Sequence, residues 1–241
     1  MLPNYLTEIR TVLNFGSVRQ GERLVYNGLP WRIADLDFYT LLHNPALSGL
    51  VRVPLTQIAK LSSRPFHKDE PWFPTKVGDI VVMNDGVQGR IERQTPEIVQ
   101  INAGESLINY RTEKFLDARP QNLSHGFVAT CVFGVDFQHQ RDALTTVEKG
   151  FQDALKQSLP EQDFADTCAH FSAEYKGMSA TALEFRLLAV FKGEAAENHG
   201  RIQRWLQRTG LECATKNGWE IPSQPIRIQT TAKTDDNRPI E

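Results

Sequence analysis

The sequence has few of the features that mark secreted, membrane-spanning or strongly charged proteins. It contains three cysteines, an odd number with no C-x-x-C pair, so we expect reduced thiols in a cytosolic setting. No stretch approaches the roughly 20 apolar residues that span a bilayer. The first residues lack the early positive charge of a signal peptide. The net charge of -2 gives no electrostatic basis for binding nucleic acid or an anionic membrane surface.

The sequence also lacks the motifs of the common enzyme classes. There is no G-x-G-x-x-G run that opens a helix after a strand, no phosphate-binding P-loop and no G-x-S-x-G elbow. The six histidines are scattered, and none lies at a recognised metal-ligand spacing. We therefore expect the chain to be no enzyme, and to hold no cofactor, no metal and no catalytic residue.

Four local groups are candidates for a functional role, and for each a structural interpretation is the simpler one. Asp35 and Asp37 fall on one face of an expected strand and could bind a cation or share a proton, but a solvated strand face is the simpler interpretation. Residues 67–70 are most simply a solvated charged loop. His139 is interpreted as a surface histidine at a helix start. Trp205 is expected to pack a helix against a sheet rather than to stack on a ligand.

The most informative positive feature is an internal repeat in the first half of the chain. Each copy contains a glycine, a β-favouring run, a tight turn rich in Asn, Asp and Gly, and an Arg-Ile pair. The corresponding residues lie 57 or 58 positions apart, as Gly21 and Gly78, Asn27 and Asn84, and Arg32 and Arg90. Each copy predicts a small set of antiparallel strands. Residues 64–74 carry three prolines and predict an extended linker between the copies.

In the second half of the chain, the spacing of apolar residues changes from that of strands alone to a mixture of strand and helix spacings. The pattern predicts strands at 127–133, within 163–176, at 183–191 and at 226–229. It predicts helices at 140–158 and at 194–209, the second of which is expected to stop at Gly210. The order β-α-β-β-α-β is that of a ferredoxin-like sandwich.

Together these patterns predict an α+β protein with two tandem small β (Sm-like) domains followed by a ferredoxin-like α/β sandwich. The expected divisions are 1–15 for a remnant or linker, 16–63 for the first β domain, 64–75 for the Pro-rich linker, 76–121 for the second β domain, 122–230 for the α/β domain and 231–241 for a disordered tail.

The run from Gly78 to Glu92 reads Gly-Asp-Ile-Val-Val-Met-Asn-Asp-Gly-Val-Gln-Gly-Arg-Ile-Glu. It resembles the G-D-x-V-x-V-x-G-x-x-G-x-V-E signature of the β domain in small-conductance mechanosensitive (MscS-like) ion channels. Residues 218–229 are similar to the closing segment of that family. Two departures stand out. The residues at 109–114 lack the family's Asn-Ser pair, and the usual member has one β domain where this chain has two.

The resemblance implies the cytoplasmic cage of a channel whose identical subunits, usually a heptamer, surround a pore that opens under bilayer tension. Such channels release ions and small osmolytes after hypo-osmotic shock. The full-length protein would lie in the cell (inner) membrane, held in the lipid bilayer by transmembrane helices absent from this chain. The chain itself would lie on the cytoplasmic side, with only a remnant of the pore helix at residues 2–13.

A homo-oligomer needs contacts between its subunits. The expected closing strand, with Ile226 and Ile228, would pair with symmetry mates. Trp72, Phe73 and Trp219 are further candidates for the subunit interface, with packing inside one subunit as the alternative. The competing hypothesis is a soluble RNA- or nucleotide-binding module built on the same folds. That function would require a basic concave surface.

Overall fold

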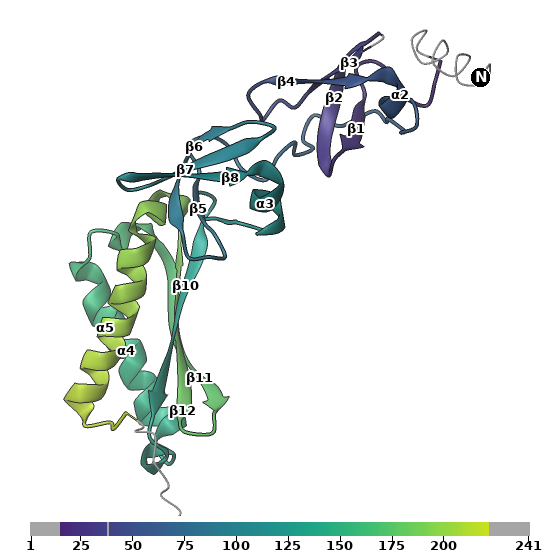
Figure 1. Cartoon of the computed structure of the whole chain (residues 1–241). Helices are drawn as coiled ribbons and strands as arrows, with labels where there is room; N and C mark the ends of the chain where they lie inside the picture. The colour runs from purple at the N-terminus through teal and green to yellow at the C-terminus, as the bar shows by residue number, and fades with distance from the viewer. Residues whose placement is uncertain (1–14, 38, 222–241) are drawn as a thin grey trace, which may run out of the picture. The chain divides into compact units, whose positions relative to one another are not determined.

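The computed structural model describes residues 15–37 and 39–221 of the chain. It has the predicted α+β class, with several sheets and few helices (Figure 1). The chain divides into two compact units. The first contains the residues up to 127 together with 191–199, and the second contains 128–190 and the residues from 200 onward.

The first sheet is a four-stranded antiparallel meander in the order β1-β2-β3-β4, followed by a single helical turn. Its elements are β1 (Arg23–Tyr26), β2 (Leu29–Leu36), β3 (Tyr39–His43), β4 (Leu50–Pro54) and α2 (Leu55–Ile58). The predicted turn between β1 and β2 is present. Asn27 and Gly28 both have positive φ, at 50° and 75°, which is the conformation that a two-residue hairpin turn requires.

The second sheet repeats this plan and adds one short strand, in the order β8-β7-β6-β5-β9. Its elements are β5 (Ile80–Val82), β6 (Gln88–Gln94), β7 (Ile98–Ala103), β8 (Ser106–Arg111), α3 (Thr112–Asp117) and β9 (Gln121–Asn122). All of its strand pairs are antiparallel.

The internal repeat of the sequence is therefore a repeat of backbone structure. The Gly21 N–H donates to the Ile33 carbonyl at 2.9 Å, and the Gly78 N–H donates to the Ile91 carbonyl at 2.8 Å. The strand register shifts directly after Ile33 and again directly after Ile91. The chain then returns to its first strand in both copies, since Arg64 bridges to β1 and β9 pairs with β5.

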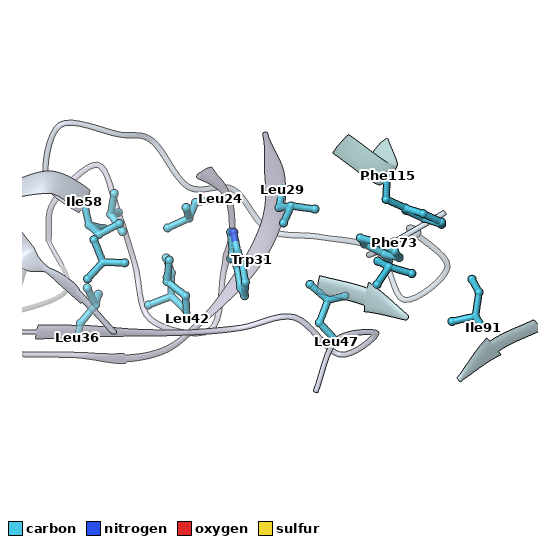
Figure 2. Close-up of a cluster of buried hydrophobic side chains, with 14 of the residues drawn as sticks. Leu24, Leu29, Trp31, Leu36, Leu42, Leu47, Ile58, Phe73, Ile91 and Phe115 are labelled. Carbon is cyan, nitrogen blue, oxygen red and sulfur yellow. The ribbon is translucent and has the colours of Figure 1, made fainter. Parts of the chain in front are cut away.

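One hydrophobic core runs through both sheets (Figure 2). Where the sheets meet, the Phe73 and Phe115 rings stack with centroids 5.9 Å apart and planes 6° apart. Buried Gln94 adds polar contacts, because its side-chain N–H₂ donates to the Ala46 carbonyl at 2.6 Å and to the Thr75 carbonyl at 3.0 Å. The two β domains thus share an interior.

The second unit contains a three-stranded sheet in the order β10-β12-β11, with helices on one face (Figure 1). Its elements are β10 (Phe127–Val135), α4 (Glu148–Ser158), β11 (Cys168–Met178), β12 (Leu183–Phe191) and α5 (His199–Asn217). The first strand lies beside the third, as in a split β-α-β arrangement. The predicted closing strand at 226–229 lies outside the described residues.

Both predicted helices of this unit need correction. The α-helix α4 begins only at Glu148, because residues 143–147 form a wider π-helical turn. Gly210 does not end the second helix, which continues to Asn217. A Cβ at Gly210 would lie 3.0 Å from the Phe133 ring of β10, so this glycine lets α5 approach the sheet closely.

Candidate functional site

The described part of the chain contains no group of three or more His, Cys, Asp or Glu side chains that could hold a metal ion. None of the helices in these residues combines the length and the hydropathy of a membrane span. The candidate sites described below are surfaces and grooves of the individual units.

The predicted polar candidates take structural roles. Asp35 and Asp37 are both exposed, and one carboxylate oxygen of Asp35 accepts a hydrogen bond from the Leu36 backbone N–H at 3.0 Å. His139 Nε2 accepts the Glu220 backbone N–H at 3.3 Å and so helps to hold the chain after α5. Neither observation points to a bound ligand.

Trp205 is buried, as expected for a packing residue. Its indole N–H donates to the Ser158 hydroxyl at 3.0 Å, and its ring meets the Phe164 ring edge-on at 5.8 Å. Both partners lie at or after the end of α4. Trp205 therefore packs α5 against this connecting segment.

The predicted interface residues make contacts inside the chain. Phe73 is buried against Phe115, and Trp219 is buried with its ring 5.2 Å from that of Phe151. Trp72 is half-buried beneath the Arg23 guanidinium, at 4.6 Å from the ring centre. Ile226 and Ile228 lie outside the described residues. The role of these five residues between subunits stays a prediction.

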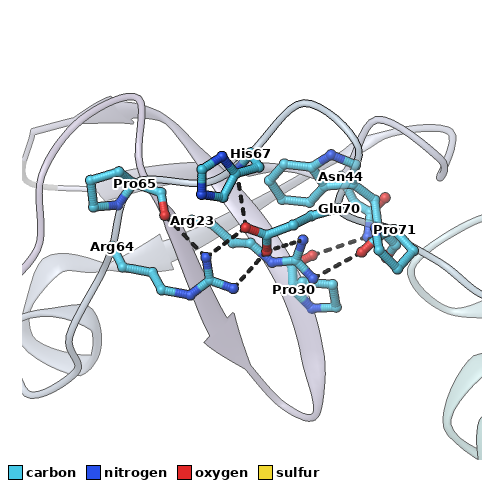
Figure 3. A network of polar contacts seen from close by, with 9 residues as sticks. Arg23, Pro30, Asn44, Arg64, Pro65, His67, Glu70 and Pro71 are labelled. Atoms are coloured by element: carbon cyan, nitrogen blue, oxygen red, sulfur yellow. Dashed lines mark hydrogen bonds and ion pairs between the residues drawn. The ribbon is translucent and has the colours of Figure 1, made fainter.

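A polar network fastens the linker to the first β domain (Figure 3). Both oxygens of Glu70 accept from the Arg64 guanidinium, at 2.8 and 2.6 Å, and the His67 backbone N–H donates to one of them at 3.0 Å. Arg23 lies 3.2 Å from the same carboxylate. The Arg64 hydrogen bond, followed by that of the His67 backbone, lowers the pKa of Glu70 to about 2.

This network corrects the interpretation of 67–70 as a solvated loop. His67, Lys68 and Asp69 are exposed, but Glu70 ties Arg64 and Arg23 together. Arg23 also donates to the Pro71 carbonyl at 2.9 Å. The predicted linker contains a turn, in which the Glu70 N–H donates to the His67 carbonyl at 3.2 Å, and it is fastened to β1.

A repeated exposed leucine marks the outer strand of each β domain. Leu50 is 60% exposed in β4, and Leu107 is 59% exposed in β8. The two positions are 57 apart, which is the period of the repeat. Both strands end their sheets within the described residues, so their outer backbone groups can pair with another strand. The sequence contained this signal, since the two leucines occupy corresponding positions.

Two grooves bear on the question of nucleic-acid binding. One, of about 750 Å³, lies between the two β domains. The other, of about 560 Å³, lies beside α5, where Arg201 pairs with Asp163 at 2.6 Å and Arg208 pairs with Glu212 at 2.7 Å. Single-strand binders need a basic groove with exposed aromatic rings. The groove beside α5 contains Arg201, Arg204 and Arg208, of which two are paired with carboxylates, and it also contains Glu161 and Glu212, so its lining is of mixed charge.

No protein-family model matches the chain, and no curated protein matches its sequence. Among solved structures, it is similar to MSL1 of Arabidopsis thaliana, with a TM-score of 0.39 and 11% identity over 63% of this chain and 54% of that protein. It is also similar to MscS of Helicobacter pylori in its closed state, with a TM-score of 0.34 and 14% identity over 96% of this chain and 68% of that one. The aligned part thus spans about half of the Arabidopsis protein.

Proposed function

We propose that this chain forms the cytoplasmic vestibule of an MscS-like channel, and that the full-length protein releases ions and small osmolytes when membrane tension rises. The observation that carries the proposal is the order of the domains. A small β domain with the Gly78–Glu92 run on β5 and β6 is followed directly by the α/β unit. The same order accompanies that run in the family that the sequence resembles.

The glycines of this run have identifiable backbone roles. Gly78 has a φ of 94°, which side-chain-bearing residues rarely adopt. A Cβ on Gly89 would lie 2.3 Å from the Asn102 carbonyl oxygen of β7, so only glycine allows this approach of the two strands. The glycines of this run are therefore required by the backbone structure of the sheet. The resemblance to the family signature thus rests on positions that have a structural role.

In the proposed assembly, identical subunits meet head to tail and close into a ring, with a heptamer as the expected form. The two β domains give this ring two tiers. Leu50 of β4 and Leu107 of β8 supply corresponding apolar contacts in the two tiers. Transmembrane helices of the full-length protein would hold the ring against the inner membrane. No observation favours the alternative of an RNA- or nucleotide-binding module.

The proposal is tested by sizing the full-length protein in detergent with multi-angle light scattering. We expect one closed oligomer, with a mass that is an integral multiple of the subunit mass. A strictly monomeric full-length protein would overturn the proposal. Anisotropy of a labelled single-stranded RNA, titrated with the chain at low salt, checks the alternative, and we expect no salt-sensitive binding.

A further inference from the structure

The groove between the two β domains has walls from both copies of the repeat. One wall is the turn of the β1–β2 hairpin, at Tyr26, Asn27 and Gly28. The other is formed by the turn before β7, at Pro96, and by the corner between β8 and α3. A single β domain would have only one of these walls, so the groove exists because the domain is duplicated.

The floor of the groove is mostly apolar, and its side chains are fixed by packing and hydrogen bonds. Leu29 and Trp31 are 7% and 3% exposed and belong to the shared core, and half-buried Leu116 packs against that core. The Trp31 indole N–H donates to the Tyr26 carbonyl at 3.1 Å, and the Tyr26 hydroxyl donates to Gln57 at 3.0 Å. These bonds satisfy the polar atoms of both aromatic side chains, so the floor presents mainly carbon to an incoming ligand.

The opposite wall is equally well anchored. The Thr112 backbone N–H donates to the Glu97 carbonyl at 3.0 Å, and its hydroxyl donates to the Thr95 carbonyl at 2.8 Å. These bonds join the start of α3 to the turn before β7. The positions of Glu97 and Glu113 on this wall are therefore set by backbone structure.

The rim of the groove is acidic. It carries the carboxylates of Glu97, Glu113 and Asp117 against one cation, Arg111. Asp117 pairs with Lys114 at 3.3 Å, whereas Glu97 and Glu113 are exposed and form no ion pair with the residues that the structure describes. An apolar floor beside a wall that carries two available carboxylates is complementary to a segment that has apolar side chains on one face and cationic side chains on the other.

We propose that this groove binds a peptide segment of a partner protein in which Lys or Arg residues flank apolar side chains. The apolar side chains lie on Leu29, Trp31 and Leu116, and the cations meet Glu97 and Glu113. A volume of about 750 Å³ accommodates a few residues of such a segment. The proposal is independent of the channel function, because the groove is complete within one chain.

The test uses the whole chain and a fluorescein-labelled probe peptide of alternating Lys and Leu, about seven residues long, of which a few residues occupy the groove. Two comparison peptides replace every Lys by Glu or every Leu by Ser. Fluorescence anisotropy should show saturable binding of the Lys-Leu peptide alone, and binding should weaken as salt is raised. Equal binding of either comparison peptide, or no binding of the Lys-Leu peptide, would overturn the proposal.

Paired variants localise the binding. Changing Glu97→Gln together with Glu113→Gln should weaken binding of the Lys-Leu peptide about tenfold, since two charge contacts are removed. The matched control changes Asp69→Asn with Glu105→Gln, two exposed carboxylates outside the groove, and should leave affinity unchanged. An equal loss of peptide affinity in both double variants would show that only the net charge of the chain matters, and it would overturn the assignment of the groove.

The competing hypothesis is that the groove binds a second copy of the chain. Sedimentation velocity of the unmodified chain and of the Glu97→Gln, Glu113→Gln variant distinguishes this case. The proposal predicts the same sedimentation profile for both. Self-association that disappears in the variant would show that the groove binds another copy, which contradicts the proposal.

Discussion

At the scale of single residues, Glu70 carries the polar network of the linker. Its pKa is lowered from the ordinary value of 4.5 to about 2, because its charged form accepts from Arg64 and from the His67 backbone. A lowered pKa means that the unfolded chain binds the proton more readily. The resulting stabilisation is fully present above about pH 4.5 and is lost as the pH falls towards 2.

We therefore predict that Glu70→Gln lowers the free energy of unfolding at neutral pH and flattens its dependence on pH between about 4.5 and 2. Urea unfolding followed by circular dichroism over this pH range measures both effects. Glu105→Gln, at an exposed carboxylate, is the control and should follow the unmodified chain. Parallel pH profiles for Glu70→Gln and the unmodified chain would contradict the role assigned to Glu70.

The second prediction at this scale concerns Gly210. In an ordinary helix interior, Gly→Ala stabilises by about 1 kcal/mol. In α5 the new methyl group would lie 3.0 Å from the Phe133 ring, which itself packs on Phe151. We expect Gly210→Ala to lower the free energy of unfolding by about 1 kcal/mol, because overpacking outweighs the gain in helix propensity.

Phe133→Leu is the companion change, because a smaller side chain leaves room for the methyl group. In chemical denaturation, the double variant should be more stable than the sum of the two single effects predicts. Additive effects would show that the Gly210–Phe133 contact does not limit the approach of α5 to the sheet.

At the scale of elements, the outer strands β4 and β8 are the proposed subunit contacts. We predict that Leu50→Lys and Leu107→Lys each reduce the oligomer fraction of the full-length protein, since a charge at an apolar edge opposes strand pairing. Light scattering in detergent measures that fraction. Val25→Lys is the matched control: Val25 is 61% exposed on β1, whose outer edge is bridged by Arg64. If all three variants assemble normally, these strands are not the interface.

The elements also show what the sequence could predict. The strands of both β domains were predictable because corresponding turn residues, such as Gly21 and Gly78, recur at a fixed spacing. The end of α5 was not predictable in this way. A glycine in a helical pattern is ambiguous until its neighbour is known, and Phe133 lies far from Gly210 along the chain.

At the scale of the whole molecule, the sequence predicted the fold class and the repeat but not the polar network or the groove. Arg64 and Glu70 are six positions apart in a proline-rich segment, where no regular period predicts that their side chains meet. The groove needs walls from both β domains, whose packing depends on Phe73, Phe115 and Gln94. Such contacts between repeats leave no periodic signal in the sequence.

The proposed channel function requires that the full-length protein open under membrane tension. The most direct test reconstitutes the full-length protein in liposomes and records currents from excised patches while suction is applied. We predict discrete currents that appear as suction rises and disappear when it is released, and that are absent from protein-free liposomes. Patches that contain the protein but give no suction-dependent current would contradict this function.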